Sequence, residues 1–415
     1  MNDKTRDFIE KNLDVDVRQL ALKGCRDKDI DLTEALRQIA GRQTARRKLP
    51  SWAAIDGILY PPHLNMEQCS SEQTARYKAV FCRRLLTVLD DVESSRPQKT
   101  SLLDLTGGFG VDFVFMSEAF DEATYVERDA QLFSISSANF ETLGIKVQRM
   151  NADGIEVLHQ TEHATVIFLD PARRDDHGAR TYGISDCTPN VLEIEDELLE
   201  KSDYLIIKLS PMLDWRKAVI DLGERFVREV HIVAVNNECK ELLVVLSRIG
   251  EGLSLFCVND QLTFLLSGDP VNSGDSVNSV SSDYTGLFLY EPNAAIMKAG
   301  CFQQVAKRYG IIPLAPNSHL FVSETLVTDF PGRIFQIQAI SSMNKRELKA
   351  SLGDIRQANI TTRNFPLSVA ELRKRLHLTD GGSTYIFATT LASGAHVLLI
   401  AHAPSVSHAD CHRAE

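Results

Sequence analysis

Carboxylates and glycines stand at four places between residues 101 and 170 where an apolar run ends. SLLDL runs into TGGFGVD, ATYVE ends at Glu127, KVQRMNA leads to Asp153, and TVIFLD ends at Asp170. Short apolar runs that end in turn residues are typical of buried strands. Because the carboxyl ends of parallel strands meet at one edge of a sheet, these side chains are expected to line a common ligand site.

The glycines and the first two acids predict a site for one nucleoside. Glycines 107, 108 and 110 lie between a strand and a helix, where they let the backbone approach a ligand and aim helix N-terminal amides at it. Glu127 ends the next strand, where an acidic side chain accepts hydrogen bonds from two ribose hydroxyls. Asn151 and Asp153 end the third strand, near the expected adenine edge.

Asp170 begins the segment DPARRDD, which is expected to face the reacting group. The Asp170 carboxylate and the Pro171 carbonyl are hydrogen-bond acceptors, and an N–H of a base flipped from its stack can donate to both. Arg173 and Arg174 are suited to bidentate contacts with flanking phosphates, although ion pairs with nearby aspartates explain them equally well.

Length and composition predict a multidomain protein that stays in the cytosol. The 415 residues suffice for roughly two to three domains. The N-terminus has no apolar secretion segment, and no window approaches the ~18 apolar residues of a membrane span, so no membrane partner is expected. Eight cysteines without a CxxC pair favour reduced thiols over disulfides or a metal site. The net charge of −11 means that a nucleic acid must be met by a local basic surface.

Patterns along the sequence divide it into segments around an α/β domain. Strand-like runs alternate with helical patterns in the central part, which is typical of a sheet covered on both faces. A Ser/Asn/Gly/Asp-rich stretch follows and is interpreted as a linker. The expected segments are a helical region at 1–85, the α/β domain at 86–266, the linker at 267–283, a small strand and helix module at 284–330, a last unit at 331–404 and a tail at 405–415.

Residues 100–250 resemble the class I S-adenosylmethionine-dependent methyltransferases. Asp104 and the glycines resemble the first motif of that family, and Asp170 to Ala172 resemble the motif beside the methyl acceptor, whereas the spacing GGFG differs from the GxGxxG of dinucleotide dehydrogenases. The resemblance implies a Rossmann-like seven-stranded sheet and S-adenosylmethionine as cofactor. It implies a cofactor site made of Asp104, Thr106, Gly107, Gly108, Gly110, Asp112, Glu127, Arg128, Asp153 and Asp170, and catalytic residues Asp170, Pro171, Arg173 and Lys208.

Further segments resemble bacterial methyltransferase-like proteins that carry a THUMP-like C-terminal domain. These segments are HLNMEQCSSEQTARYKA, LDPARRD, KLSPMLDW, NECKELL and GSTYIFATTL. The resemblance implies a ferredoxin-like module at 284–330, a THUMP-like domain at 331–404, and an RNA substrate such as tRNA or rRNA, because THUMP-type domains accompany RNA-modifying enzymes.

The last unit is basic although the whole protein is acidic. Between Arg333 and Arg375, nine Lys/Arg residues face three acids, and phosphate binding relies on such surfaces, although a solvated helix face is the plain alternative. The predicted RNA-binding residues are Arg173, Arg174, Lys345, Arg346, Lys349, Arg356, Arg373, Lys374 and Arg375. A second basic group, which has the same alternative, contains Arg42, Arg46, Arg47 and Lys48.

The acceptor atom is predicted to be a base nitrogen, and a ribose 2′-oxygen is the main alternative. Amine methyltransferases usually carry a second proline and an aromatic residue where this sequence has Ala172 and Arg173. Ribose 2′-O transfer uses a Lys-Asp-Lys-Glu set, for which Lys78, Asp170, Lys208 and Glu229 are candidates. Carbon methylation needs a cysteine where Ser210 stands. A catalytically silent RNA-binding protein is a further alternative.

Candidates for contact with the methionine carboxylate of the cofactor are Gln68, Ser71 and Thr74.

Overall fold

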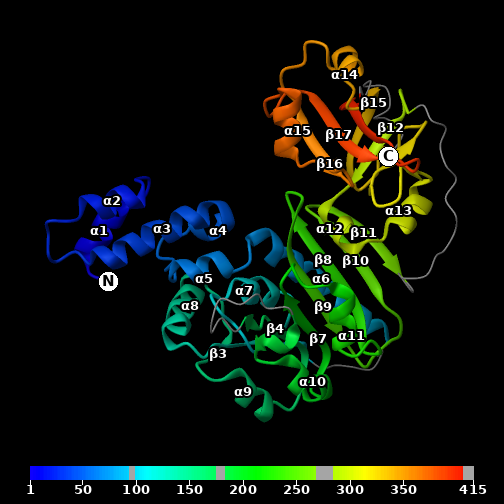
Figure 1. The fold of residues 1–415 in the computed structure, drawn as a ribbon. Coiled ribbons are helices and arrows are strands. Elements are labelled where there is room, and N and C mark those ends of the chain that lie inside the picture. The colour runs from blue at the N-terminus through cyan, green and yellow to red at the C-terminus, as the bar shows by residue number, and fades with distance from the viewer. Residues whose placement is uncertain (93–98, 174–182, 268–283, 405–415) are drawn as a thin grey trace, which may run out of the picture. The chain divides into compact units, whose positions relative to one another are not determined.

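The structure is a computed structural model that describes residues 1–92, 99–173, 183–267 and 284–404. Its contacts divide the protein into two compact units (Figure 1). The first unit contains residues 1–235 and 240–254, and the second contains residues 236–239 and the residues from 255 onward. Within the described residues, no helix is both long and apolar enough to cross a membrane.

The first unit is built on a twisted sheet whose strands follow the order β3-β2-β1-β4-β7-β9-β8. Strands β3 to β7 in this order pair in parallel, whereas β9 runs antiparallel to β7. The strands are β1 (Ser101–Asp104), β2 (Glu122–Val126), β3 (Gln148–Met150), β4 (Ala164–Leu169), β7 (Ser202–Leu209), β8 (Val227–Val235) and β9 (Glu238–Leu246). The predicted Rossmann-like α/β fold is confirmed.

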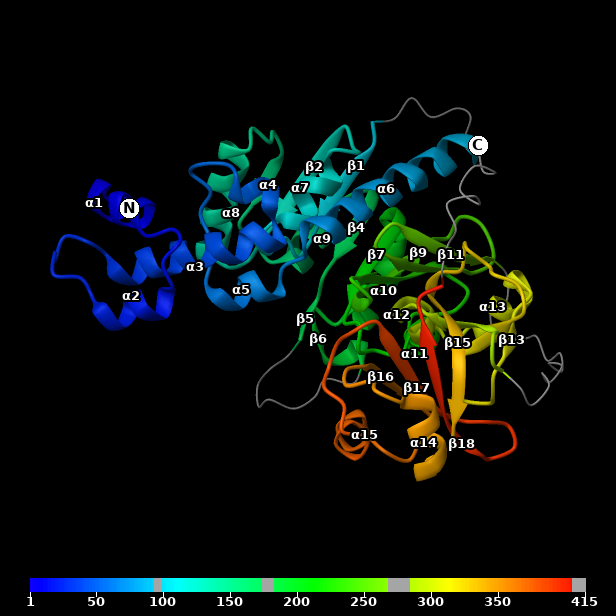
Figure 2. The ribbon, with the colours of Figure 1, turned by 90° about the horizontal axis from the view of Figure 1, so that it is seen from above.

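Helices cover both faces of this sheet, as Figures 1 and 2 show. All six residues of β4 are buried as a result. The helices beside the sheet are α6 (Glu72–Val92), α7 (Val111–Ser117), α8 (Ala130–Thr142), α9 (Gly154–Gln160), α10 (Val191–Glu200) and α11 (Trp215–Asp221). Between β4 and α10 lie β5 (Ala172–Arg173), a 3-10 turn (Ile184–Asp186) and β6 (Cys187–Thr188).

The N-terminal region before α6 is helical, and its longest helix is α3 (Leu32–Lys48). The Asp31 carboxylate accepts a hydrogen bond from the Glu34 N–H and thereby caps this helix. The five helices are α1 (Asp3–Lys11), α2 (Val17–Lys23), α3 (Leu32–Lys48), α4 (Pro50–Ala53) and α5 (His63–Gln68).

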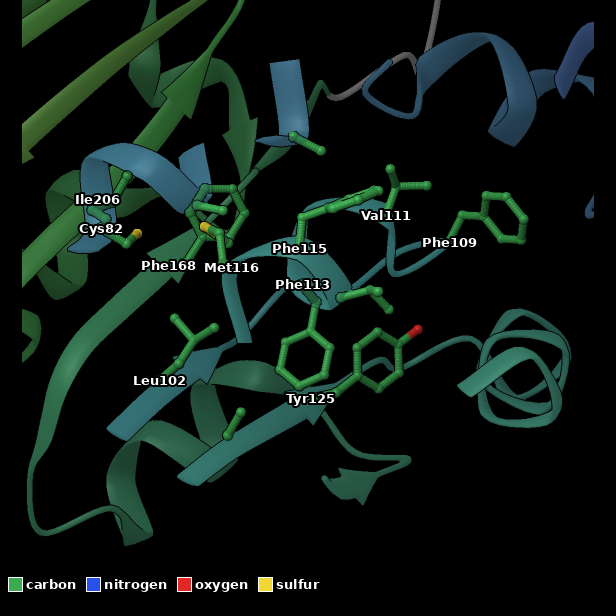
Figure 3. Packing of buried hydrophobic residues seen from close by; sticks show 14 of the residues in the cluster. Cys82, Leu102, Phe109, Val111, Phe113, Phe115, Met116, Tyr125, Phe168 and Ile206 are labelled. Atoms are coloured by element: carbon green, nitrogen blue, oxygen red, sulfur yellow. The ribbon is translucent and has the colours of Figure 1, made fainter. Parts of the chain in front are cut away.

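The core beside α6 and α7 is rich in aromatic rings (Figure 3). Phe113 of α7 packs on Tyr125 of β2, with ring centroids 5.4 Å apart, and Phe140 of α8 meets the Tyr125 ring edge to face. Burial of each such side chain contributes about 1.5–3 kcal/mol. This cluster fixes the strand ends of β1 and β2 beneath the glycine turn.

The second unit contains a seven-stranded sheet with the order β13-β14-β12-β15-β18-β17-β16. Its strands pair antiparallel except for β16 and β17, which are parallel. The unit contains β10 (Ser254–Asn259), β11 (Leu262–Ser267), β12 (Phe288–Pro292), α12 (Ala294–Ala299), α13 (Phe302–Tyr309), β13 (Ile312–Pro313), β14 (Phe321–Ser323), β15 (Gly332–Ser341), α14 (Lys345–Leu352), β16 (Asn359–Arg363), α15 (Val369–Leu376), β17 (Thr384–Thr390) and β18 (His396–His402). A capping box formed by Ser368 and Glu371 opens α15.

The glycine turn after β1 is held by the protein's own aromatic rings. A Cβ at Gly107 would lie 2.1 Å from the Tyr125 ring, and a Cβ at Gly110 would lie 2.6 Å from the Phe140 ring. Gly110 also has a φ of +81°, which disfavours residues with a side chain. Close packing on these rings is therefore sufficient reason for both glycines.

Replacing Gly110 by alanine tests this packing. Gly110→Ala is expected to lower the free energy of unfolding by about 2–4 kcal/mol, because it adds a steric clash to the backbone strain. Gly144→Ala is the matched control, since Gly144 also has a positive φ of +71° but a Cβ added there would meet no atom within 4 Å. Urea denaturation of both variants measures the difference, and equal losses would contradict the packing argument.

Candidate active site

Thr106 connects the ends of β1 and β4 at the predicted edge. Its N–H donates to Asp104 Oδ1 at 2.9 Å, and its Oγ1 accepts from the Asp170 N–H at 2.6 Å. The Asp104 side chain is buried. Burial raises the pKa of Asp104 well above its usual range, and the nearby carboxylates of Asp112, Asp170 and Glu127 raise it further. The edge therefore disfavours a further negative charge.

Glu127 lies at the end of β2 and binds the backbone of the glycine turn. Its two oxygens accept from the Gly108 N–H at 2.8 Å and from the Asp129 N–H at 2.7 Å. The Gly108 carbonyl accepts from the Tyr125 hydroxyl and the Ser136 hydroxyl. Because a carboxylate has about four acceptor positions, Glu127 retains capacity for two ribose hydroxyls.

The polar residues after β3 fix the neighbouring turn. Asn151 Nδ2 donates to the Glu127 carbonyl at 2.7 Å and to the Arg128 carbonyl at 3.2 Å. Asp153 Oδ1 accepts from the Ile155 N–H at 2.8 Å and caps α9. Arg128 is exposed. The structure thus brings the ends of β2 and β3 together, as the sequence predicts, while the Asn151 and Asp153 side chains also have structural partners.

Five ionisable residues form a buried charge cluster beside this edge, namely Glu241, Lys78, Asp112, Lys208 and Asp170. Lys78 Nζ lies 2.5 Å from Glu241 Oε1 and 3.2 Å from Asp112 Oδ1. Lys208 Nζ lies 3.1 Å from Asp112 Oδ2 and 2.5 Å from Asp170 Oδ2. Positive and negative groups therefore alternate from β9 through α6, α7 and β7 to the residue after β4.

The buried charge cluster reaches solvent at one end. The Lys78 side chain is 0% exposed, whereas the Asp170 side chain is 40% exposed and the Lys208 side chain 11%. Burial would lower the pKa of Lys208, but Asp112 and Asp170 outweigh it and hold that pKa well above its usual value. Lys208 is therefore an ammonium group at neutral pH, placed directly behind the accessible carboxylate.

The sequence-based Lys-Asp-Lys-Glu set needs a correction at its glutamate. Glu229, on β8, is not in the buried charge cluster: it forms an ion pair with Arg84 at 2.8 Å and a hydrogen bond with His231 Nε2 at 2.8 Å. Glu241 stands beside Lys78 instead, because β9 lies between β7 and β8 in the sheet. A signal existed in the sequence, since Glu241 is a single acid at the start of the apolar run LLVVL.

Ser70 is a second residue at the site that was not among the predicted site residues. Its Oγ donates to Asp112 Oδ2 at 2.7 Å. Of the three predicted neighbours of the methionine carboxylate, Thr74 is buried and its hydroxyl donates to the Ser71 carbonyl at 3.1 Å, while Gln68 is exposed at the end of α5.

Cys69 lies close to the buried charge cluster although the sequence analysis assigned no cysteine to it. Burial raises the pKa of the Cys69 thiol to about 11, against the opposing effect of Lys48 and Lys208. The thiol therefore stays protonated and is a weak nucleophile.

The remaining predicted residues of the first unit lie partly outside the described part of the protein. Pro171 is buried, and Arg173 belongs to β5, which pairs with β6, but its side chain is not described and Arg174 lies outside the described residues. Within the described residues, no group of three or more His, Cys, Asp or Glu side chains is arranged to hold a metal.

The second basic group of the sequence analysis is engaged in local contacts. Arg42 pairs with Asp56 at 3.0 Å, and Arg46 pairs with Asp14. Lys48 Nζ donates to the carbonyls of α5 residues Met66 and Glu67 at 2.9 and 2.6 Å. Local contacts thus account for three of its four side chains, which favours a structural role there.

In the second unit, most of the predicted RNA-binding residues are exposed. Exposed side chains are those of Lys345, Arg346, Lys349, Arg356, Lys374 and Arg375. Arg373 instead donates to the Ala358 carbonyl at 3.2 Å and to Asp380. The acids among them are partly engaged, since Glu347 accepts from the Ser342 N–H and Glu371 from the Ser368 N–H.

A hollow of about 520 Å³ adjoins Arg356 in the second unit. His377, Thr379 and Ser383 contribute polar side chains to its lining. Exposed cations beside a polar hollow are typical of a surface that binds phosphates.

Two family models match the C-terminal part of the protein. A model described as a ferredoxin-like domain matches residues 288–331, and one described as THUMP domain-like matches residues 332–403. The ferredoxin-like and THUMP-like character of the two predicted C-terminal modules is therefore confirmed.

Relatives match most of the protein, including the part before residue 288. A crystal structure of a protein assigned as a methyltransferase, from Porphyromonas gingivalis W83, is 30% identical, covers 98% of this protein and 100% of its own chain, and superposes with a TM-score of 0.82. Uncharacterized S-adenosylmethionine-dependent methyltransferases from two Mycobacterium tuberculosis strains are 23% identical over 306 residues, which is 73% of this protein and 81% of theirs.

The raised pKa of Asp104 predicts how stability depends on pH. The folded protein keeps a proton on Asp104 that the unfolded chain releases near 3.8, so stability is lost as the pH rises from that value toward the raised pKa. Asp104→Asn cannot ionise and is expected to remove this loss. Its advantage over the wild type should grow by up to about 1.4 kcal/mol per pH unit in that window.

Urea denaturation at a series of pH values measures this effect. Asp121→Asn is the control, because a backbone hydrogen bond from Thr100 lowers the pKa of Asp121 and its contribution is lost only as the pH falls. Parallel stability curves for the wild type and Asp104→Asn would contradict the assignment.

Proposed function

Because the protein belongs to the S-adenosylmethionine-dependent methyltransferases, we propose that it methylates RNA, at a ribose hydroxyl held by Asp170 and Lys208. The THUMP-like match supports RNA as the substrate, because domains of that type accompany RNA-modifying enzymes. The exposed cations of α14, α15 and Arg356 support it independently, since they can neutralise phosphates.

The residues at the strand ends fit S-adenosylmethionine. When bound, the cofactor supplies an electrophilic methyl group on a cationic sulfonium. The edge holds a buried Asp104 whose charged form is opposed by neighbouring carboxylates, so a cation there is favourable. The residues proposed to hold the cofactor are Asp104, Thr106, Gly107, Gly108, Gly110, Glu127, Arg128 and Asp153. Of these, Glu127 has acceptor positions free for the ribose hydroxyls.

The observation that carries the ribose acceptor is the contact between Lys208 and Asp170 within the buried charge cluster. A ribose hydroxyl has to be oriented and has to lose its proton while its oxygen is methylated. Asp170 is accessible and accepts a hydrogen bond from the hydroxyl, and Lys208 Nζ takes the proton in the small fraction of molecules in which it is not already an ammonium group, a fraction that grows with pH. Lys78 and Glu241 are buried behind this pair and complete the Lys-Asp-Lys-Glu composition.

A base nitrogen is the second candidate acceptor. Lys208 pairs with Asp170 through Oδ2, and the Asp170 side chain is 40% exposed, so an N–H donor can approach the other oxygen. In that reaction Lys208 stays an ammonium group and the carboxylate acts as an acceptor for the amine. The two candidates differ in their products and in whether the rate depends on a neutral lysine.

Loss of Lys208 tests the role of this pair. Lys208→Met is expected to lower the rate of methyl transfer to total RNA by about 10²–10⁴-fold, because it removes the proton acceptor, while S-adenosylmethionine still raises the melting temperature. Lys201→Met is the control, since Lys201 pairs with Glu197 at the other end of β7.

Nucleoside analysis of the labelled RNA identifies the acceptor. A ribose-methylated nucleotide resists alkaline cleavage and is the expected product. A methylated base favours the second candidate, and label confined to protein or small molecules rejects RNA as the substrate. If S-adenosylmethionine does not raise the melting temperature of the wild type, the protein is instead a catalytically silent RNA-binding protein.

Charge removal on α14 tests the RNA surface. The combined substitution of Lys345, Arg346 and Lys349 by alanine is expected to weaken RNA binding and to make log K less dependent on log salt, by about 0.7–0.9 for each phosphate that is no longer neutralised. Arg333→Ala is the control, because Arg333 pairs with the buried Glu291. Titration of both variants at several salt concentrations measures the slopes, and equal slopes would contradict the assignment.

A further inference from the structure

Asp112 is the residue that joins the two lysines of the buried charge cluster. Its Oδ1 lies 3.2 Å from Lys78 Nζ, and its Oδ2 lies 3.1 Å from Lys208 Nζ and accepts from the Ser70 hydroxyl at 2.7 Å. The side chain is 10% exposed. Asp112 thus lies within ion-pair distance of a lysine on each oxygen, although Oδ1 has no hydrogen-bond partner among the described residues.

The surroundings of Asp112 contain more acid than base. The cations that face it are Lys78 from α6 and Lys208 from β7. The acids within electrostatic reach are Asp104 at the end of β1, Asp170 after β4 and Glu241 on β9. The Cys69 thiol is also near, but it is protonated. Two lysines are thus shared among a larger number of carboxyl groups.

We propose that Asp112 is a positioning residue that holds Lys208 beside Asp170 as an ammonium group and thereby sets how basic the solution must be before Lys208 can accept a proton. The inference rests on the proposed role of Lys208 as the proton acceptor. It assigns Asp112 no contact with the substrate, because its oxygens face Lys78, Lys208 and Ser70.

The geometry fixes the direction of the effect. Lys208 Nζ has two carboxylate neighbours, and Asp170 alone would leave it free to turn toward the accessible edge. Asp112 binds it from the buried side and adds a second negative charge. After burial, which acts in the opposite direction, Asp112 is the largest influence on the pKa of Lys208 and raises it. Removing that charge makes Lys208 lose its proton at a lower pH.

Asp112→Asn in the full-length protein tests the proposal, because asparagine keeps the shape and removes the charge. Lysine ¹³Cε signals are followed by NMR across pH, and the Lys208 signal is identified by its loss in Lys208→Met. The titration midpoint of Lys208 is expected to fall in Asp112→Asn. Glu197→Gln is the control, since it removes a carboxylate from another lysine pair in the same unit and should leave Lys208 unchanged.

Methyl transfer gives the second measurement and does not presuppose RNA. Labelled S-adenosylmethionine is supplied with a cell extract, and label is counted in whichever fraction the wild type modifies. The rise of kcat with pH is expected to move to lower pH in Asp112→Asn, so that below the midpoint the rate at a given pH exceeds that of the wild type several-fold. A purely structural role predicts a lower melting temperature with an unchanged profile.

The outcomes separate the proposal from the function on which it rests. An unchanged Lys208 midpoint overturns the proposal. If the Lys208 midpoint falls but the dependence of kcat on pH is unchanged, the result supports the proposal that Asp112 holds Lys208 as an ammonium group. The same result overturns the proposed role of Lys208 as the proton acceptor. Should Asp112→Asn fail to fold, Asp112→Glu keeps the charge and is expected to keep the Lys208 midpoint high, and a fall in that variant overturns the proposal.

Discussion

The burial of two lysines with the carboxyl groups of Asp112 and Glu241, beside the accessible Asp170, is the constraint on which the rest of the first unit depends. Removing such charges from water costs several kcal/mol for each ion, which only close and well-directed pairing offsets. The buried charge cluster satisfies this condition because α6, α7, β7, β9 and the end of β4 meet there. A shift of any one of them would leave a buried charge without its partner, so the reacting edge and the core are specified together.

Sheet topology explains which parts of this site the sequence could predict. Asp104, Glu127 and Asp170 stand at the ends of strands that pair in parallel, so their meeting at one edge follows from the apolar pattern. Glu241 is different, because β9 comes after β8 in the sequence but lies between β7 and β8 in the sheet. The pattern of apolar runs does not show this insertion, and Glu229 on the earlier strand was therefore the natural but mistaken choice.

Local partners set the second limit on prediction from sequence. The glycine turn was correctly located, but Gly107 and Gly110 also make room for the rings of Tyr125 and Phe140, residues that follow later in the sequence. In the C-terminal unit, the count of basic residues predicted a cationic surface, yet Arg373 is occupied by Asp380. Residue type shows what a side chain can bind, whereas the three-dimensional structure shows which partner already binds it.

The residues of the buried charge cluster differ in exposure, and this difference separates those that can meet a substrate from those that only hold them in place. Asp170 and Lys208 border solvent, whereas Lys78 and Glu241 are enclosed. An enclosed ion pair is weak evidence for stability, because apolar residues of similar volume often replace one at no cost. The position of Lys78 supplies another reason for that pair: it places a cation 3.2 Å from Asp112 Oδ1, while Oδ2 faces Lys208. Lys78 and Glu241 thus influence, through Asp112, how strongly Lys208 is held. Asp170 and Lys208 are the residues that a substrate can contact.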